Sequence, residues 1–109
     1  MIHFRVTRKA LEDLNGIGRY TEKEWGRSQR NHYLKQLDGC FALLADDPGL
    51  GTQCDYIANA YRKFPQGSHI IFYKLDQNGV VEIIRVLHEA MDADKQFDEI
   101  RETSALVYE

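Results

Sequence analysis

Residues 61–88, with the sequence YRKFPQGSHIIFYKLDQNGVVEIIRVLH, decide the fold because they predict three consecutive β-strands. The strands are expected at residues 61–64, 69–75 and 80–87. Pro65 and Gly67 are typical of a turn after the first strand, since proline fixes φ and glycine allows positive φ. Asn78-Gly79 is a strong hairpin signal between the second and third strands. The β-branched and aromatic residues between these turns suit a pleated surface, so we predict a three-stranded antiparallel sheet.

The N-terminal residues predict one strand followed by a helix. Residues 2–6 alternate apolar and polar side chains, which is the period of a strand with one solvated face. Thr7 then suits the N-cap of a helix over residues 8–25. Side chains recur at helical spacing in this segment at Ala10, Leu14, Ile17, Thr21 and Trp25. Because Gly16 and Gly18 each cost about 1 kcal/mol relative to alanine, we expect the middle of the helix to be held by packing or to admit a close neighbour.

A second helix is predicted from Ser28 onward. Its apolar face consists of Tyr33, Leu37, Cys40 and Leu44, widened by Leu34 and Phe41. Pro48 and Gly49 stop it. Only Gly26 and Arg27 separate it from the first helix, so the two should form an antiparallel hairpin. We predict an α+β fold of order βααβββ, in which Leu14 and Ile17 are buried with the second helix against the sheet.

Composition bounds the function classes. The 109 residues suffice for one domain and carry a net charge of −3. Residues 89–109 hold seven acidic and two basic residues, which leaves +2 for residues 1–88. That is far from the basic footprint of a nucleic-acid-binding protein, so no direct sequence-specific nucleic-acid binding is predicted. Without a secretory signal or an apolar run of about 20 residues, the expected location is cytoplasmic, with no membrane partner.

Cofactors and metals are not predicted. Cys40 and Cys54 show no ligand spacing with each other or with the four histidines. A disulfide between them does not suit a reducing compartment. At the C-terminus, helical spacing recurs at Phe97, Ile100, Ser104 and Val107. A short acidic helix and a frayed terminus both remain open there.

Taken as a set, a series of short motifs resembles the ParE branch of the RelE/ParE toxin superfamily. The set consists of Ala10, Asp13-Leu14, Ile17, Tyr20 and Trp25-Gly26, then Tyr33, Leu37, Phe41, Leu44-Ala45, Pro48 and Leu50-Gly51, and finally Tyr61-Arg62-Lys63-Phe64-Pro65, Gly67-Ser68-His69-Ile70-Ile71-Phe72-Tyr73, Ile84-Arg85-Val86-Leu87-His88 and Met91-Asp92. The likeness assigns residues 1–97 to a ParE-like toxin domain and leaves residues 98–109 as an acidic extension. Glu89 and Ala90 depart from the small or basic pair expected in this branch.

The resemblance implies a helix hairpin packed on one face of a small antiparallel sheet. It also implies a ParD-like antitoxin, encoded by the adjacent gene, whose disordered C-terminal segment folds over the toxin. The ParE branch inhibits DNA gyrase, whereas the RelE branch cleaves messenger RNA on the ribosome. We predict a non-enzymatic gyrase inhibitor. The alternatives are a RelE-type endonuclease and a non-toxic interaction partner with the same fold.

Two surfaces are predicted from these considerations. Target contacts are expected on the open sheet face and the segment after it, from Arg62, Arg85, His88 and Met91. Antitoxin contacts are expected from Leu11, Trp25, Leu34 and Phe41. For Arg85 the alternative is an ion pair with Glu82 or with an acid of the tail, and for Trp25 it is a place in the core. Strand parity puts Arg85 and His88 on opposite faces unless a bulge intervenes, so no complete nuclease set of acid, base and phosphate-binding cations is predicted.

Overall fold

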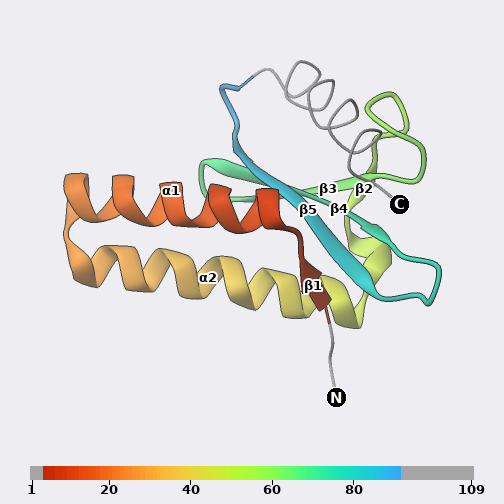
Figure 1. The fold of residues 1–109 in the computed structure, drawn as a ribbon, viewed down its shortest axis with the longest axis horizontal. Coiled ribbons are helices and arrows are strands. Elements are labelled where there is room, and N and C mark those ends of the chain that lie inside the picture. The colour runs from red at the N-terminus through yellow and green to blue at the C-terminus, as the bar shows by residue number, and fades with distance from the viewer. Residues whose placement is uncertain (1–3, 92–109) are drawn as a thin grey trace.

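The structure is a computed structural model and describes residues 4–91. A helix hairpin covers one face of a five-stranded sheet, as Figure 1 shows. The elements, in chain order, are β1 (Phe4–Val6), α1 (Arg8–Trp25), α2 (Arg27–Asp46), the short 3-10 helix η1 (Pro48–Leu50), β2 (Thr52–Gln53), β3 (Arg62–Gln66), β4 (His69–Leu75) and β5 (Val81–His88). The predicted fold class is confirmed, while the predicted C-terminal helix and the extension at residues 98–109 lie outside the described residues.

The helix hairpin is formed by local signals. The Thr7 hydroxyl oxygen accepts a hydrogen bond from the Ala10 amide at 3.1 Å, which caps α1 at its first turn. Gly26 alone joins the helices, with φ at 92°, a conformation that favours glycine. The close neighbour expected beside the helical glycines is Leu34, because a Cβ atom at Gly18 would lie 3.3 Å from its Cδ1. Both predicted helices are confirmed, and α2 begins one residue earlier than expected.

The sheet differs from the prediction at its edges. Its order is β1-β5-β4-β3-β2, and β1 pairs with β5 in parallel, so the sheet is mixed rather than antiparallel throughout. The predicted order lacked β2, which pairs with β3 over two residues. The β3 strand continues through Pro65 to Gln66, beyond its predicted end. Proline is tolerated there because β2 pairs only as far as Lys63, which leaves Pro65 at a sheet edge.

A bulge in β5 changes which side chains share a face. Phe72 is opposite Arg85 and Tyr73 is opposite Ile83, so Ile84 is an extra residue in β5. As a result Ile83 and Val86 both pack on the helix side of the sheet. The bulge lies before Arg85 and the register is regular from Arg85 to His88, so the predicted parity of these two residues does not change.

Apolar side chains are buried on both faces of the sheet. The helix-side core lies between the hairpin and the sheet and contains Ala10, Ile17, Leu37, Phe41, Leu44, Ile71, Tyr73, Val81, Ile83 and Val86, with Leu14, Tyr33 and Cys40 packed against it. This confirms the predicted burial of the α2 face. The second-face cluster lies on the opposite side and contains Cys54, Ile57, Phe72, Ile84 and Leu87, with Ala58, Tyr61 and Ile70 against it. Across residues 4–91, no helix combines the length and the apolar character needed to cross a membrane.

Candidate partner-binding groove

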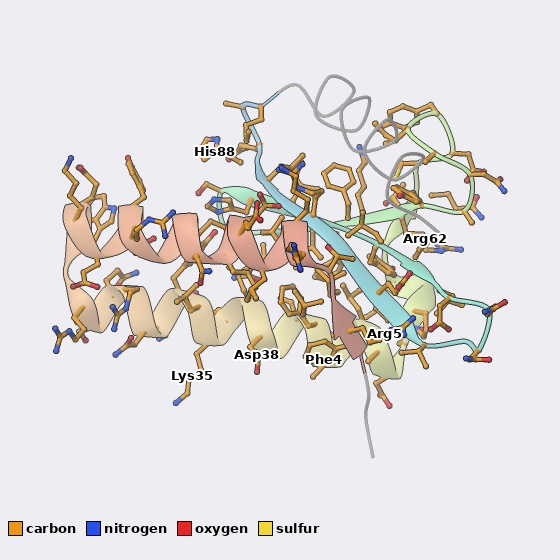
Figure 2. The ribbon with its side chains drawn as sticks, in the orientation of Figure 1. Phe4, Arg5, Lys35, Asp38, Arg62 and His88 are labelled. Carbon is orange, nitrogen blue, oxygen red and sulfur yellow. The ribbon has the colours of Figure 1, made fainter. Side chains whose placement is uncertain are left out.

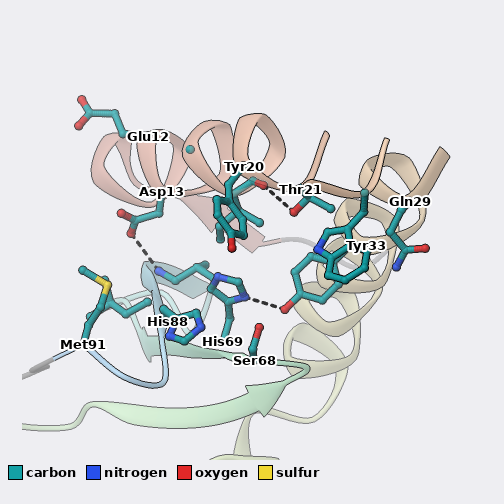
Figure 3. A pocket seen from close by; sticks show the side chains of 15 residues that line it. Glu12, Asp13, Tyr20, Thr21, Gln29, Tyr33, Ser68, His69, His88 and Met91 are labelled. Atoms are coloured by element: carbon teal, nitrogen blue, oxygen red, sulfur yellow. Dashed lines mark hydrogen bonds between the residues drawn. The ribbon is translucent and has the colours of Figure 1, made fainter. Parts of the chain in front are cut away.

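An open groove of about 890 Å³ runs between the helix hairpin and the ends of β4 and β5. Its walls come from α1, from the first turns of α2, from the β3–β4 turn and from the segment after β5 (Figure 3). The side chains that bear on its chemistry are Asp13, Tyr20, Trp25, Tyr33, His69, His88 and Met91. Segments far apart in the sequence meet here because the hairpin lies across the sheet.

The floor of the groove contains a buried ion pair. Asp13 on α1 accepts hydrogen bonds from Arg85 Nε at 2.6 Å and from Arg85 Nη2 at 2.8 Å. The two side chains are only 13% and 8% exposed, respectively. Such a bidentate pair holds both groups in one geometry. The Arg85 guanidinium is thus already bound by a carboxylate within the chain.

Asp13 also accepts a backbone hydrogen bond at the edge of β5, where no strand within residues 4–91 is paired. β1 pairs with β5 only at residues 81–83, so the next part of the β5 edge has no strand beside it. There the Asp13 carboxylate accepts from the Val86 amide at 3.0 Å, and the Ile84 carbonyl accepts from the Thr7 hydroxyl at 3.0 Å. Buried backbone groups need such partners. One carboxylate therefore satisfies both the sheet edge and Arg85.

A tyrosine and two histidines line the groove where α2 meets the sheet. His69 and His88 are opposite each other in β4 and β5, with ring centroids 5.4 Å apart and nearly perpendicular planes. Tyr33 donates to the Gln66 carbonyl at 3.1 Å and lies 2.6 Å from His69 Nδ1. Burial lowers the pKa of His69, and the neighbouring His88 lowers it further. His69 is therefore neutral near pH 7, and His88 Nδ1 accepts from the Ala90 amide.

The upper walls of the groove are apolar and exposed. Trp25 is 72% exposed, Tyr20 65% and Met91 43%. Tryptophan and tyrosine are the residues that most often dominate binding energy at protein interfaces. Large aromatic side chains left in water around a concave surface are typical of a site for another chain. The expectation that Trp25 lies in the core is wrong, because it stands at the end of α1 beyond the sheet.

The four residues predicted to contact the target are not on one open face. His88 and Met91 line the groove. Arg85 lies beneath it, 6% exposed and paired with Asp13 rather than with Glu82, so its expected exposure is wrong. Arg62 is elsewhere: it faces Tyr73 across β3 and β4 and donates to the Gly51 carbonyl at 2.6 Å. Figure 2 shows it well apart from His88.

The four residues predicted to contact the antitoxin are also divided. Trp25 lines the groove, and Leu11 is 53% exposed on α1. Leu34 is half-buried between the helices. Phe41 is 2% exposed, with its ring edge-on to that of Phe4 at 5.6 Å, so its expected place on the surface is wrong. The α2 face is wide enough that Phe41 points at β1 instead of at solvent.

Asp13, Tyr20 and Tyr33 line the groove but were not predicted as site residues. All three belong to the motif set, but no local pattern connects them with β5 or the β3–β4 turn. Tyr33 is placed by Gly67, whose positive φ turns the chain and whose missing Cβ leaves room for the tyrosine ring. Within residues 4–91, no group of three potential metal ligands comes together, and both cysteines are free.

The comparisons with known proteins agree with this architecture. The model of the family "ParE toxin of type II toxin-antitoxin system, parDE" matches residues 4–103. Toxin ParE1 of Caulobacter vibrioides is 38% identical over 90 residues, covering 83% of this chain and 92% of its own. Toxin ParE1 of Mycobacterium tuberculosis is 39% identical over 86 residues, covering 79% and 88%, and toxin ParE of Escherichia coli is 32% identical over 92 residues, covering 84% and 89%.

A solved structure of a chromosomal ParDE TA system from P. aeruginosa has the same fold. Its TM-score is 0.68 at 16% sequence identity, over 81% of this chain and 96% of that one. At this identity the likeness concerns the fold alone, two helices packed on a small mixed sheet. The chain belongs to the ParE toxin family of type II toxin–antitoxin systems.

Proposed function

We propose that this toxin binds and inhibits DNA gyrase without catalysing a reaction, and that a ParD-like antitoxin from the adjacent gene neutralises it. The proposal rests on membership of the ParE family, because the resemblance to the ParE branch implies DNA gyrase as the target. It also rests on the chemistry of the groove. An inhibitor of this kind needs only a higher affinity for one state of the gyrase–DNA cycle than for the others.

The buried ion pair is the observation that carries the proposal against a nuclease. Phosphate cleavage requires cations that stabilise the charge developing on the phosphate, together with an acid and a base. Arg85 gives both of its hydrogen bonds in the groove floor to Asp13. His69 is half-buried, neutral near pH 7 and close to the Tyr33 hydroxyl. These groups stabilise one another, and the aromatic walls above them suit a protein ligand.

The groove also offers a simple means of neutralisation. His88 and Met91, predicted for the target, and Trp25, predicted for the antitoxin, line the same groove. An antitoxin segment that folds into it would cover the target-contacting residues by occupying the same space. Folding on binding suits a segment that must later release the toxin. Under this proposal, toxin bound to antitoxin cannot bind gyrase.

A supercoiling assay with purified gyrase tests the proposal. The toxin should block supercoiling or trap cleaved DNA, and Met91→Ala should weaken this effect by about tenfold or more if Met91 lies in the contact. Leu75→Ala is a matched control, since Leu75 is similarly exposed at 48% but lies at the far end of β4. Added antitoxin should restore supercoiling. Normal supercoiling at a large molar excess of folded toxin would refute the gyrase proposal.

A RelE-type endonuclease is the second candidate, and the perpendicular His69–His88 pair is the observation that favours it. The same preparation can be added to ribosomes translating a defined messenger RNA. Cleaved transcripts that disappear in His88→Ala, with gyrase unaffected, would support the nuclease. Intact transcripts together with inhibited gyrase would support the inhibitor. Harmless overexpression of folded protein would favour the non-toxic partner.

A further inference from the structure

The second-face cluster needs a cover that the hairpin does not provide, because α1 and α2 pack on the other face. In the part of the chain that the structure describes, the loop at residues 54–61 contributes to this cluster. That loop joins β2 to β3 and so belongs to one edge of the sheet. Ile84 and Leu87 lie on β5, two strands away from β3, at about 4.8 Å per strand. They are nevertheless only 7% and 3% exposed.

Two lysines on this face carry positive charge. Lys63 is opposite Phe72, a member of the cluster, and Lys74 follows Phe72 by two residues on the same side of β4. Their ammonium groups lie 5.7 Å and 6.0 Å from the ring centroids of Tyr56 and Tyr61. Between residues 4 and 91, no carboxylate forms an ion pair with either lysine. The face therefore presents apolar surface beside two positive charges.

Glu82 lies opposite Lys74 in β5 and β4, but within residues 4–91 no ion pair joins the two side chains. Arg5 pairs with Glu82 at 3.1 Å and with Asp76 at 2.6 Å. Asp55, in the loop, accepts from the Ala60 amide. The acids near this face thus have partners of their own. Lys63 donates to the Tyr56 hydroxyl at 3.0 Å, a neutral partner, so both lysines keep a positive charge that an acidic segment could approach.

The C-terminal residues have the matching composition. Residues 92–109 contain six acidic and two basic residues, and their apolar residues Phe97, Ile100 and Val107 recur at helical spacing. The segment starts shortly after β5 ends at His88, next to the strand that carries Ile84 and Leu87. As a helix, its 18 residues would measure about 27 Å. That length exceeds the width of about 15 Å from β5 to β2.

We propose that residues 92–109 dock on the second face of the sheet, with their apolar residues against the second-face cluster and their acidic residues beside Lys63 and Lys74. The sheet is then covered on both faces by the chain itself. The groove on the helix side stays open for partners. This inference does not depend on gyrase being the target.

The two native cysteines provide the test, because they lie on opposite sides of the sheet. Cys54 belongs to the second-face cluster and is fully buried, whereas Cys40 packs against the helix-side core near Gln66. Alkylation of each thiol in the full chain can be followed by mass spectrometry. Ile100→Asp should speed alkylation of Cys54 by about tenfold or more and leave Cys40 unchanged, since only the second face becomes accessible. Ala105→Asp, which adds the same charge outside the apolar spacing, should change neither rate.

Charge removal gives a second, milder arm. Lys74→Gln should speed alkylation of Cys54 several-fold, and salt at about 1 M should do the same in the unchanged chain, because screening then acts within about 3 Å. If Ile100→Asp unfolds the whole domain, both thiols will react faster together. The Cys54 alkylation rate in Lys74→Gln then tests whether residues 92–109 dock on the second face. The proposal would be overturned if Cys54 were alkylated at the unchanged rate both in Lys74→Gln and in a folded Ile100→Asp variant.

Discussion

Replacing Asp13 by alanine should destabilise the fold strongly, because it leaves Arg85 buried without its partner. The guanidinium is nearly enclosed, and both of its hydrogen bonds in the groove end on Asp13. Removing one member of a buried ion pair costs about 3–5 kcal/mol. That is a large part of the roughly 5–15 kcal/mol that stabilises a domain of this kind. Urea unfolding followed by circular dichroism would show the loss as a lower midpoint at an unchanged slope.

Two further variants separate the possible causes. Glu12→Ala breaks the exposed Lys9–Glu12 pair in the same turn of α1, at 3.9 Å, and should change the free energy of unfolding by no more than about 0.5 kcal/mol. Adding Arg85→Met to Asp13→Ala removes the unpaired charge and should recover part of the loss. The remainder, about 1–3 kcal/mol, belongs to the Val86 amide without its acceptor. If Asp13→Ala costs no more than Glu12→Ala, the ion pair does not hold α1 to β5.

Three other outcomes follow from the packing and from the groove. Leu37→Ala should lower the free energy of unfolding by about 2–5 kcal/mol, because Leu37 is fully buried in the helix-side core. A smaller loss, measured by urea unfolding, would contradict this packing. Gly51→Ala should destabilise the fold by about 1–3 kcal/mol, since its Cβ would overlap the Tyr73 hydroxyl and approach the Lys63 carbonyl oxygen at 2.8 Å. Gly39→Ala, which meets open space in α2, should stabilise it by about 0.5–1 kcal/mol. Equal melting temperatures of the two variants in thermal unfolding would contradict this packing. The pKa of His69 is lower in the folded than in the unfolded chain, so the free energy of unfolding should fall as the pH drops below 6.5. His69→Gln should reduce this pH dependence in urea titrations at several pH values. An identical pH profile in the variant would exclude His69 as its source.

Local chemistry explains why much of the fold could be predicted. The bounds of α1 follow from Thr7, whose hydroxyl caps it, and from Gly26, which adopts a positive φ after it. Gly67 and Gly79 likewise adopt the positive φ that the β3–β4 and β4–β5 turns require. These signals act between residues a few positions apart, so they are visible in a single sequence. The buried face of α2 was predictable for the same reason, because Leu37 and Leu44 are spaced by whole helical turns.

The candidate site was predictable only in part. His88 ends the last strand and Met91 lies three residues after it, so their place beside one another needs nothing beyond the chain order. Periodicity placed Phe41 on the apolar face of α2, but it could not show that the ring packs edge-on against Phe4 of β1, which leaves it buried. Trp25 is exposed, although large apolar residues are usually buried. Its exposure arises because α1 extends beyond the sheet (Figure 1).

By itself, the sequence determined the order of the elements, the hairpin and the family, since caps, turns and periodicity are properties of neighbouring residues. Only the tertiary structure decided what Arg85 does. Its partner Asp13 lies 72 positions away, and the contact is possible because β1 ends before this part of the β5 edge. The bulge at Ile84, which leaves Ile83 and Val86 on the same face, was also decided only by the tertiary structure. A bulge shifts every later side chain of a strand to the other face, and whether one forms depends on the neighbouring strand. The groove lies where the Asp13–Arg85 contact joins α1 to β5, so its position also depends on residues far apart in the sequence.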